Sequence, residues 1–308
     1  MGHDHRHDSD ADRRWLVSAL VLIVAFMAGE VIAGLLAHSL ALLTDAAHML
    51  TDAAALLVAI AAAVIVRRPA RGAYTYGFAR VDALSGQANG ITMLLLAVFF
   101  EVVAIRRLVH PSAVHGGVVT VVALIGAVVN VVAVMLARRA DRSSLSVRGA
   151  VAHLANDAWA FAATLAAGVI VLATSWSRAD ALASMFVGVL MFWTGASLVR
   201  AAGRVFLEAA PAGIDPSELG ERLAATRGVA EVHDLHVWQL GPRETALSAH
   251  VLVQPTLDCH DVSTRLRALL ADTYGIGHVT LQADHAGSSV HDADNCADAH
   301  GEVHVSTD

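Results

Sequence analysis

The sequence contains no lysine and only two cysteines, although it is 308 residues long. Cys259 and Cys296 both lie outside the apolar parts of the chain and form neither a disulfide framework nor a CxxC metal motif. Histidine is abundant instead, with 17 copies. Any metal chemistry must therefore rest on histidine and carboxylate side chains.

Charge is also scarce, because only 16% of the residues are charged while 56% are hydrophobic, and the mean hydropathy is +0.57. The apolar residues form blocks near the length that crosses a bilayer, which is typical of a polytopic membrane protein. The net charge of -7 comes from acidic residues near the two ends, whereas arginines flank the apolar blocks. Nucleic-acid binding is therefore excluded as a function class.

Each apolar block is long enough to cross a hydrocarbon core of about 30 Å at about 1.5 Å per residue. The blocks cover residues 15–37, 40–66, 83–105, 116–137, 149–175 and 180–201. The first is too long for the apolar part of a signal peptide, so we expect it to stay in the membrane. Most arginines gather before the first block, in alternate loops and after the sixth, which predicts a multi-pass protein with both termini in the cytoplasm.

The composition changes to that of a soluble domain after Pro211. Helix patterns at 215–227 and 260–273 alternate with strand-like runs VAEVHDLHVWQL, ALSAHVLVQ and GHVTLQAD, which predicts a small αββαβ, ferredoxin-like domain with one sheet face under two helices. A domain of this size is marginal alone, so association with a second copy is expected. The predicted organisation is a His/Asp-rich N-terminal tail at 1–14, a six-helix membrane domain at 15–204, a cytoplasmic domain at 205–285 and a disordered His/Asp-rich tail at 286–308.

An HxxxD pair occurs twice, as His48 with Asp52 in the second segment and as His153 with Asp157 in the fifth. The i, i+4 spacing puts both side chains of a pair on one helix face. Ionisable residues at the bilayer centre cost about 2.5 to 3.5 kcal/mol each, so four of them should face the bundle interior and share a partner. The alternative is that each pair forms only a structural contact between helices.

Two imidazoles and two carboxylates can complete the tetrahedral shell that Zn²⁺ takes. Ca²⁺ and Mg²⁺ require more oxygen ligands, and Cu(I) prefers sulfur. The sequence therefore predicts Zn²⁺ as the ion, with Cd²⁺, Co²⁺, Ni²⁺ and Fe²⁺ as alternatives. Asp45 lies on the same helix face as His48 and Asp52, but it is about 10 Å along the helix axis from Asp52, so we assign it to access or support of the site. Glu30 is interpreted as a group that hydrogen-bonds between helices or lines a water-filled cavity.

These segments resemble the cation diffusion facilitator family of zinc exporters, through SLALLTDAAHMLTD, YTYGFARVDAL, HLANDAWA, VHDLHVWQL and GIGHVTLQAD. The resemblance implies a homodimer, associated through the cytoplasmic domains, that exchanges a divalent metal ion for protons across the lipid bilayer. It identifies His48, Asp52, His153 and Asp157 as the transport site. Relatives with His rather than Asp at the first of these positions tend to favour Zn²⁺ over Cd²⁺. The resemblance also suggests a bacterial inner membrane as the location.

The resemblance further implies metal ligands in the cytoplasmic domain at His233, His250 and Asp284, with His260 and His278 near other family ligands. His236 is interpreted as structural. The loop at 67–80 has neither His nor Asp, so the extra metal site that some relatives carry there is not expected. The His-rich termini either collect metal or are incidental solvated tails.

Two rival functions remain at this stage. An intramembrane metalloenzyme would need an activating base and an open coordination position, but the sequence has no HExxH and the four ligands would fill the shell. The prediction is therefore that the chain is not an enzyme. A membrane-anchored metal sensor would leave the two matched HxxxD pairs unexplained.

Overall fold

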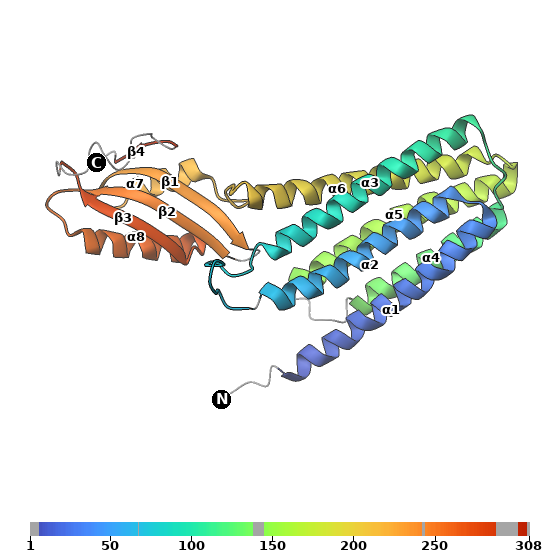
Figure 1. The fold of residues 1–308 in the computed structure, drawn as a ribbon, viewed down its shortest axis with the longest axis horizontal. Helices are drawn as coiled ribbons and strands as arrows, with labels where there is room; N and C mark the ends of the chain where they lie inside the picture. The colour runs from blue at the N-terminus through green and yellow to red at the C-terminus, as the bar shows by residue number, and fades with distance from the viewer. Residues whose placement is uncertain (1–5, 67, 138–144, 242–243, 288–300, 307–308) are drawn as a thin grey trace. The chain divides into compact units, whose positions relative to one another are not determined.

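The computed structural model describes residues 6–66, 68–137, 145–241, 244–287 and 301–306 (Figure 1). The chain divides into two compact units, Met1–Ile60 with Gly86–Val199, and Ala61–Ser85 with Arg200–Asp308. Each unit is described by itself below.

The first unit is built from long helices, whose order agrees with the apolar segments of the sequence. Their bounds are α1 (Arg6–Ala37), α2 (Leu40–Val66), α3 (Val81–Val109), α4 (Gly116–Ala137), α5 (Leu145–Thr174) and α6 (Arg178–Phe206). Helix α1 begins earlier and α6 ends later than the apolar segments predict. The polar residues at these two ends continue the helices because helix propensity does not require apolar side chains.

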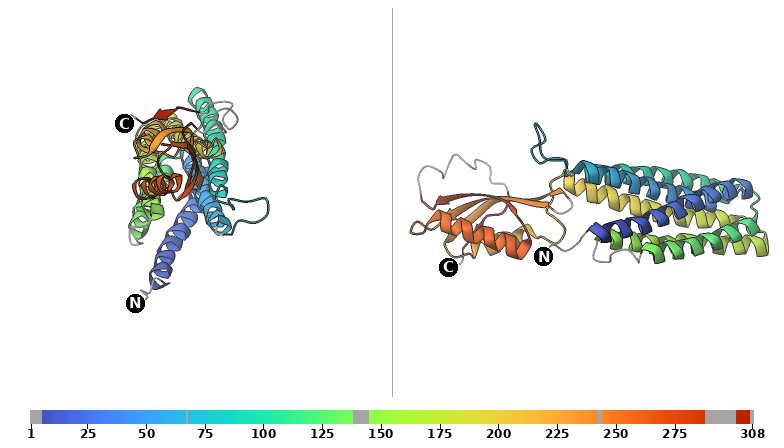
Figure 2. Two further views of the ribbon diagram at one scale, coloured as in Figure 1. Left: turned by 90° about the vertical axis from the view of Figure 1, so that its left-hand side faces the viewer. Right: turned by 90° about the horizontal axis from the view of Figure 1, so that it is seen from below.

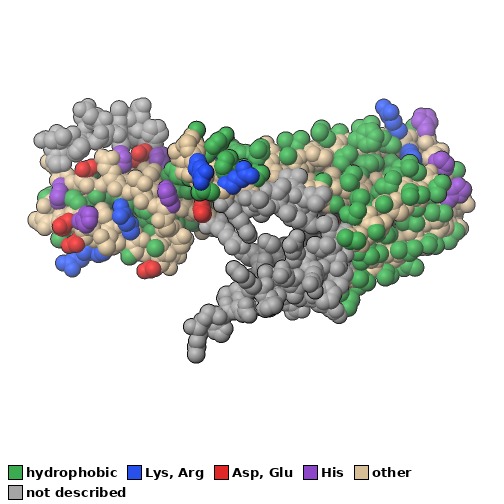
Figure 3. All heavy atoms as spheres, turned by 60° about the horizontal axis from the view of Figure 1, so that its bottom comes forward, with side chains coloured by type: hydrophobic (Ala, Val, Ile, Leu, Met, Phe, Trp, Pro, Cys, Tyr) green, Lys and Arg blue, Asp and Glu red, His purple; other side chains and the backbone are tan. Residues whose placement is uncertain are grey.

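Large hydrophobic side chains point outward from these helices, among them Leu95 and Trp193, which are 68% and 77% exposed. Figure 3 shows hydrophobic side chains over most of the described face of the helices. Among the described residues, α3, α6 and residues Asp157–Thr174 of α5 are long and apolar enough to span a membrane. Shorter apolar stretches occupy Val24–Ala37, Leu40–Thr51 and Gly116–Val132. The number of six spans stays a prediction.

Helices α3 and α6 approach each other closely where two glycines meet. A Cβ atom at Gly90 would lie 2.9 Å from the carbonyl oxygen of Gly195, and the reverse distance is also 2.9 Å. Arg178 Nε also donates to the carbonyl oxygen of Leu108, 3.0 Å away. Small residues at such a crossing let two membrane helices pack backbone to backbone.

The second unit contains the predicted αββαβ order. Its elements are α7 (Pro216–Ala224), β1 (Val229–Gly241), β2 (Glu244–Val253), α8 (Cys259–Tyr274), β3 (His278–His285) and β4 (His304–Val305). The sheet order is β3-β2-β1-β4, with β2 and β3 parallel and the other pairs antiparallel. Asp215 and Asp258 cap the N-termini of the two helices, and Gly275 ends α8 in the left-handed conformation.

One face of the sheet is buried under the two helices, as the sequence predicts (Figure 2). Alternate residues of β2, including Leu247 and Val251, join Leu219 of α7 and Leu266 of α8 in one apolar core. Since successive side chains of a strand point to opposite faces, the residues between them lie on the other, open face. The open face carries His250.

The sequence predicts disorder for residues 286–308, and the structure describes residues 301–306 of this tail. Residues 288–300 lie outside the described residues, but β4 pairs with the outer edge of β1, and His304 is only 9% exposed. Its ring packs against Gly220 of α7, where a Cβ atom would meet it at 2.2 Å. A strand of two residues has no sequence periodicity and forms only because a sheet edge is available.

Candidate metal centre

Helices α2 and α5 bring the two HxxxD motifs together. His48 Nε2 lies 3.3 Å from Asp157 Oδ1, and the two side chains are 8% and 13% exposed. Asp52 and His153 lie one helical turn along on the same two helices, and their side chains are outside the described part of the chain. The sequence predicted that the motifs face each other, and one residue from each motif is in contact in the structure.

Asp45 is buried in the bundle, with 1% of its surface exposed. Glu30 of α1 is equally buried, and the two carboxyl groups lie close enough to interact. Sequence reasoning assigned both residues separately, to access or support and to helix contacts. It could not pair them, because they belong to different helices.

The small domain presents two of its predicted ligands side by side on the open face of the sheet. His233 of β1 is paired with His250 of β2, and their ring centroids are 5.4 Å apart. Asp234 lies close to two imidazoles. Its Oδ1 is 3.0 Å from His236 Nε2, and its Oδ2 is 3.9 Å from His250 Nε2. His233 Nδ1 also lies 2.9 Å from Glu231 Oε1.

A backbone irregularity places Asp234 among these imidazoles. The residue has a φ of 51°, in the left-handed region, and the register of β1 with β2 shifts between His233 and His236. Such a β-bulge re-aims the side chains beside it. Sequence reasoning did not select Asp234; the signal was an Asp, a residue that tolerates positive φ, between two histidines in VHDLH.

The other predicted ligands of the small domain are on β3 and α8. Asp284 of β3 is paired with Leu252 of β2. Its side chain accepts a hydrogen bond from Gln282 Nε2 at 3.2 Å. His278 is at the opposite end of β3, and His260 lies in the first turn of α8. Cys259 Sγ, which the sequence did not select, lies 3.5 Å from the ring nitrogens of His285. Within the described ranges, no three His, Cys, Asp or Glu side chains are grouped closely enough to hold a metal ion.

Known proteins give an independent comparison over nearly the whole chain. The model of the cation efflux transmembrane domain matches residues 16–207, and that of the cation efflux protein cytoplasmic domain matches residues 211–286. The chain is 32% identical to the cadmium, cobalt and zinc/H(+)-K(+) antiporter of Bacillus velezensis, with 96% of this chain and 95% of that protein aligned.

Two other relatives are similar over comparable lengths. Identity is 33% to the metal cation efflux system protein CzcD of Cupriavidus metallidurans, with 95% of this chain and 93% of that protein covered. It is also 33% to the zinc transporter ZitB of Escherichia coli, with 92% and 93% covered. The transmembrane helices, the small α/β domain and these matches show a membrane transporter rather than an enzyme, and the chain belongs to the cation diffusion facilitator family of metal cation exporters.

Proposed function

We propose that the protein exports Zn²⁺ from the cytoplasm in exchange for protons, through a four-ligand site formed by His48, Asp52, His153 and Asp157. The contact between His48 and Asp157, from two different HxxxD motifs, is the observation that carries this proposal. Helices α2 and α5 are antiparallel, being separated by two intervening helices. Residues 52 and 153 therefore lie one turn from the contact toward the same end of the bundle, where they would complete the shell.

The donor set supports zinc as the transported ion. Two imidazole nitrogens and two carboxylate oxygens match a tetrahedral Zn²⁺ site, and Zn²⁺ has no preference for a different geometry. One relative is named as an antiporter of cadmium, cobalt and zinc and another as a zinc transporter, so Cd²⁺ and Co²⁺ are the first competitors to test, followed by Ni²⁺ and Fe²⁺.

Proton exchange follows from the chemistry of these ligands. Neutral imidazole and ionised carboxylate bind a metal ion, whereas their protonated forms do not, so proton binding and metal binding compete. Metal enters the site from the cytoplasm, the bundle changes access, and protons from the other side displace the metal. Rocking of helices around a site near the middle of the bilayer produces such alternating access.

Asp45 is too far along α2 to share the ion with Asp52. Its position beside Glu30 supports a role in joining α1 to α2, next to the face of α2 that carries His48 and Asp52. This contact favours support of the site over direct access.

The proposed exchange predicts metal flux driven by a pH gradient alone. Purified protein in liposomes loaded with Zn²⁺, with a pH gradient imposed across the bilayer, should move the metal against the direction of proton flow. A zinc-sensitive dye measures the flux, and liposomes without protein give the leak. If folded protein with all four proposed ligands shows no flux under the pH gradient, the proposal is contradicted, and the membrane-anchored sensor would then be favoured.

The small domain is proposed to bind metal as a regulator and to join two copies of the chain. His233 and His250 already face each other, so two nitrogen donors suited to Zn²⁺ are in place. Asp284, on the neighbouring strand, would supply a carboxylate, and Asp234 Oδ2, which lies 3.9 Å from His250 Nε2, is a second carboxylate close to this pair. Metal bound here would bring two small domains together and favour the transport-ready state.

Loss of this regulatory site should lower transport without removing the intramembrane site. We expect the combined His233→Ala, His250→Ala and Asp284→Ala variant to transport Zn²⁺ about fivefold or more slowly, the effect of a coupling free energy of about 1 kcal/mol. Flux in liposomes measures the rate. Thr280→Ala changes an exposed residue of β3 that is not a proposed ligand and should transport normally, whereas a normal rate in the triple variant would count against regulation.

A further inference from the structure

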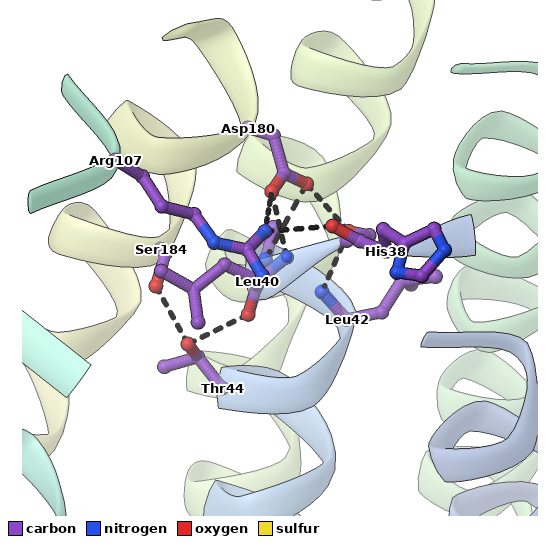
Figure 4. A network of polar contacts seen from close by, with 9 residues as sticks. His38, Leu40, Leu42, Thr44, Arg107, Asp180 and Ser184 are labelled. Carbon is purple, nitrogen blue, oxygen red and sulfur yellow. Dashed lines mark hydrogen bonds and ion pairs between the residues drawn. The ribbon is translucent and has the colours of Figure 1, made fainter. Parts of the chain in front are cut away.

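The turn between α1 and α2 is held by a buried polar network that sequence reasoning did not predict (Figure 4). Asp180, in the first turn of α6, accepts from the Ser39 hydroxyl and from the backbone N–H of Leu40, 2.7 Å away. Ser39 and Asp180 are 0% and 1% exposed. A carboxylate at this place satisfies N–H groups that the first turn of a helix leaves without intrahelical partners, and it matches the positive end of the helix dipole.

Arg107 holds the other side of the same turn. Its Nη1 donates to the carbonyl oxygen of His38 at 2.6 Å and lies 3.7 Å from Asp180 Oδ2. His38 has a φ of 55°, which is uncommon for a residue with a side chain. The carbonyl group of His38 and the first N–H groups of α2 are therefore held by side chains from α3 and α6 together.

This network fixes α2 relative to the helix that carries Asp157. Helix α5 ends at Thr174 and α6 begins at Arg178, so Asp180 is tied to α5 through a short turn. His48 lies about 13 Å along α2 from Ser39, at about 1.5 Å per residue. Any axial shift or rotation at the start of α2 is carried along the rigid helix to His48 and changes its distance from Asp157.

We propose that Asp180 is a positioning residue for metal transport: by holding the N-terminus of α2 against α6, it sets the register of His48 opposite Asp157. This inference deepens the proposed function and rests on it. Asp180 does not touch the metal, so its loss should weaken metal binding through geometry rather than remove a ligand.

The test compares Asp180→Asn and Asp180→Glu with Ser184→Ala in liposomes. Ser184 Oγ lies 2.6 Å from Thr44 Oγ1, so its removal breaks a contact between α6 and α2 without touching the helix start. Asp180→Asn should raise the KM for Zn²⁺ about tenfold, because a shift of His48 by less than about 1 Å costs less than the roughly 100-fold that a misplacement of about 1 Å can cost. Asp180→Glu keeps the charge and should recover part of the loss, and Ser184→Ala should behave as the unaltered protein.

A second measurement separates this inference from the proposed function. Bound Co²⁺ in a tetrahedral shell gives strong visible absorption, and Asp180→Asn should require more Co²⁺ and give a weaker, shifted spectrum. If the unaltered protein shows this spectrum but no flux, the proposed transport function is overturned and the positioning role of Asp180 is not. An unchanged KM and an unchanged spectrum in Asp180→Asn, or equal losses in Ser184→Ala, would overturn the positioning role. If Asp180→Asn does not fold, Ser39→Ala and Arg107→Gln each remove part of the network around Asp180 and must shift both measurements in the same direction.

Discussion

Replacing His48 with alanine is expected to abolish zinc transport while leaving the fold intact. The imidazole is buried between α2 and α5, and its removal takes away one of four proposed ligands and leaves Asp157 without its 3.3 Å contact. Loss of even an outer-shell partner costs a metal site about 10- to 100-fold, so loss of a ligand should lower flux by more than about 100-fold. Zinc uptake into everted vesicles measures the change.

Two matched variants give this result its meaning. His110→Ala removes an exposed histidine just beyond the end of α3, and it should transport normally. The double variant His48→Ala with Asp157→Ala should be no worse than either single variant, because residues that share one site show non-additive losses. Additive losses would place the two residues in separate functions, and normal flux in His48→Ala would remove it from the transport site.

Much of the fold could be predicted because the physics is local. A helix in lipid must satisfy its own backbone groups, so apolar segments of sufficient length identify α1 to α6 without knowledge of their contacts. The strand-like runs of the sequence likewise predict a sheet with one covered face, and alternate residues of β2 are buried in the structure. Strand β4 could not be predicted, since its two residues gain their order from the edge of β1 and from the space left by Gly220.

The candidate sites divide in the same way. The i, i+4 spacing of His48 to Asp52 and of His153 to Asp157 puts each pair on one helix face. The sequence therefore predicts which face of each helix carries the proposed ligands. Contacts between distant segments that share no motif could not be predicted, and the contact of Asp180 with Ser39, 141 positions apart in the sequence, is the main example. Asp234 was missed for another reason, because its place beside His236 and His250 depends on a β-bulge and a positive φ.

The identity of the residue at position 48, a proposed metal ligand, should also decide which metal is carried. A histidine supplies one nitrogen in a fixed direction, whereas a carboxylate can bind through one or both oxygens. The His48→Asp variant should therefore accept a larger ion with more ligands, and the rate with Cd²⁺ relative to Zn²⁺ should rise about tenfold, a change of about 1.4 kcal/mol in discrimination. Parallel flux assays with the two ions measure the ratio.

The control for this change must carry the same charge difference away from the site. His115→Asp does so, since His115 lies in the exposed connection before α4, where its backbone N–H donates to the carbonyl oxygen of Ala37. It should leave the ratio unchanged. An equal shift in both variants would point to a general effect of negative charge on cation entry. An unchanged ratio in His48→Asp would mean that the first position does not select the ion, and selectivity would then have to come from Asp52, His153 and Asp157 or from the path to them.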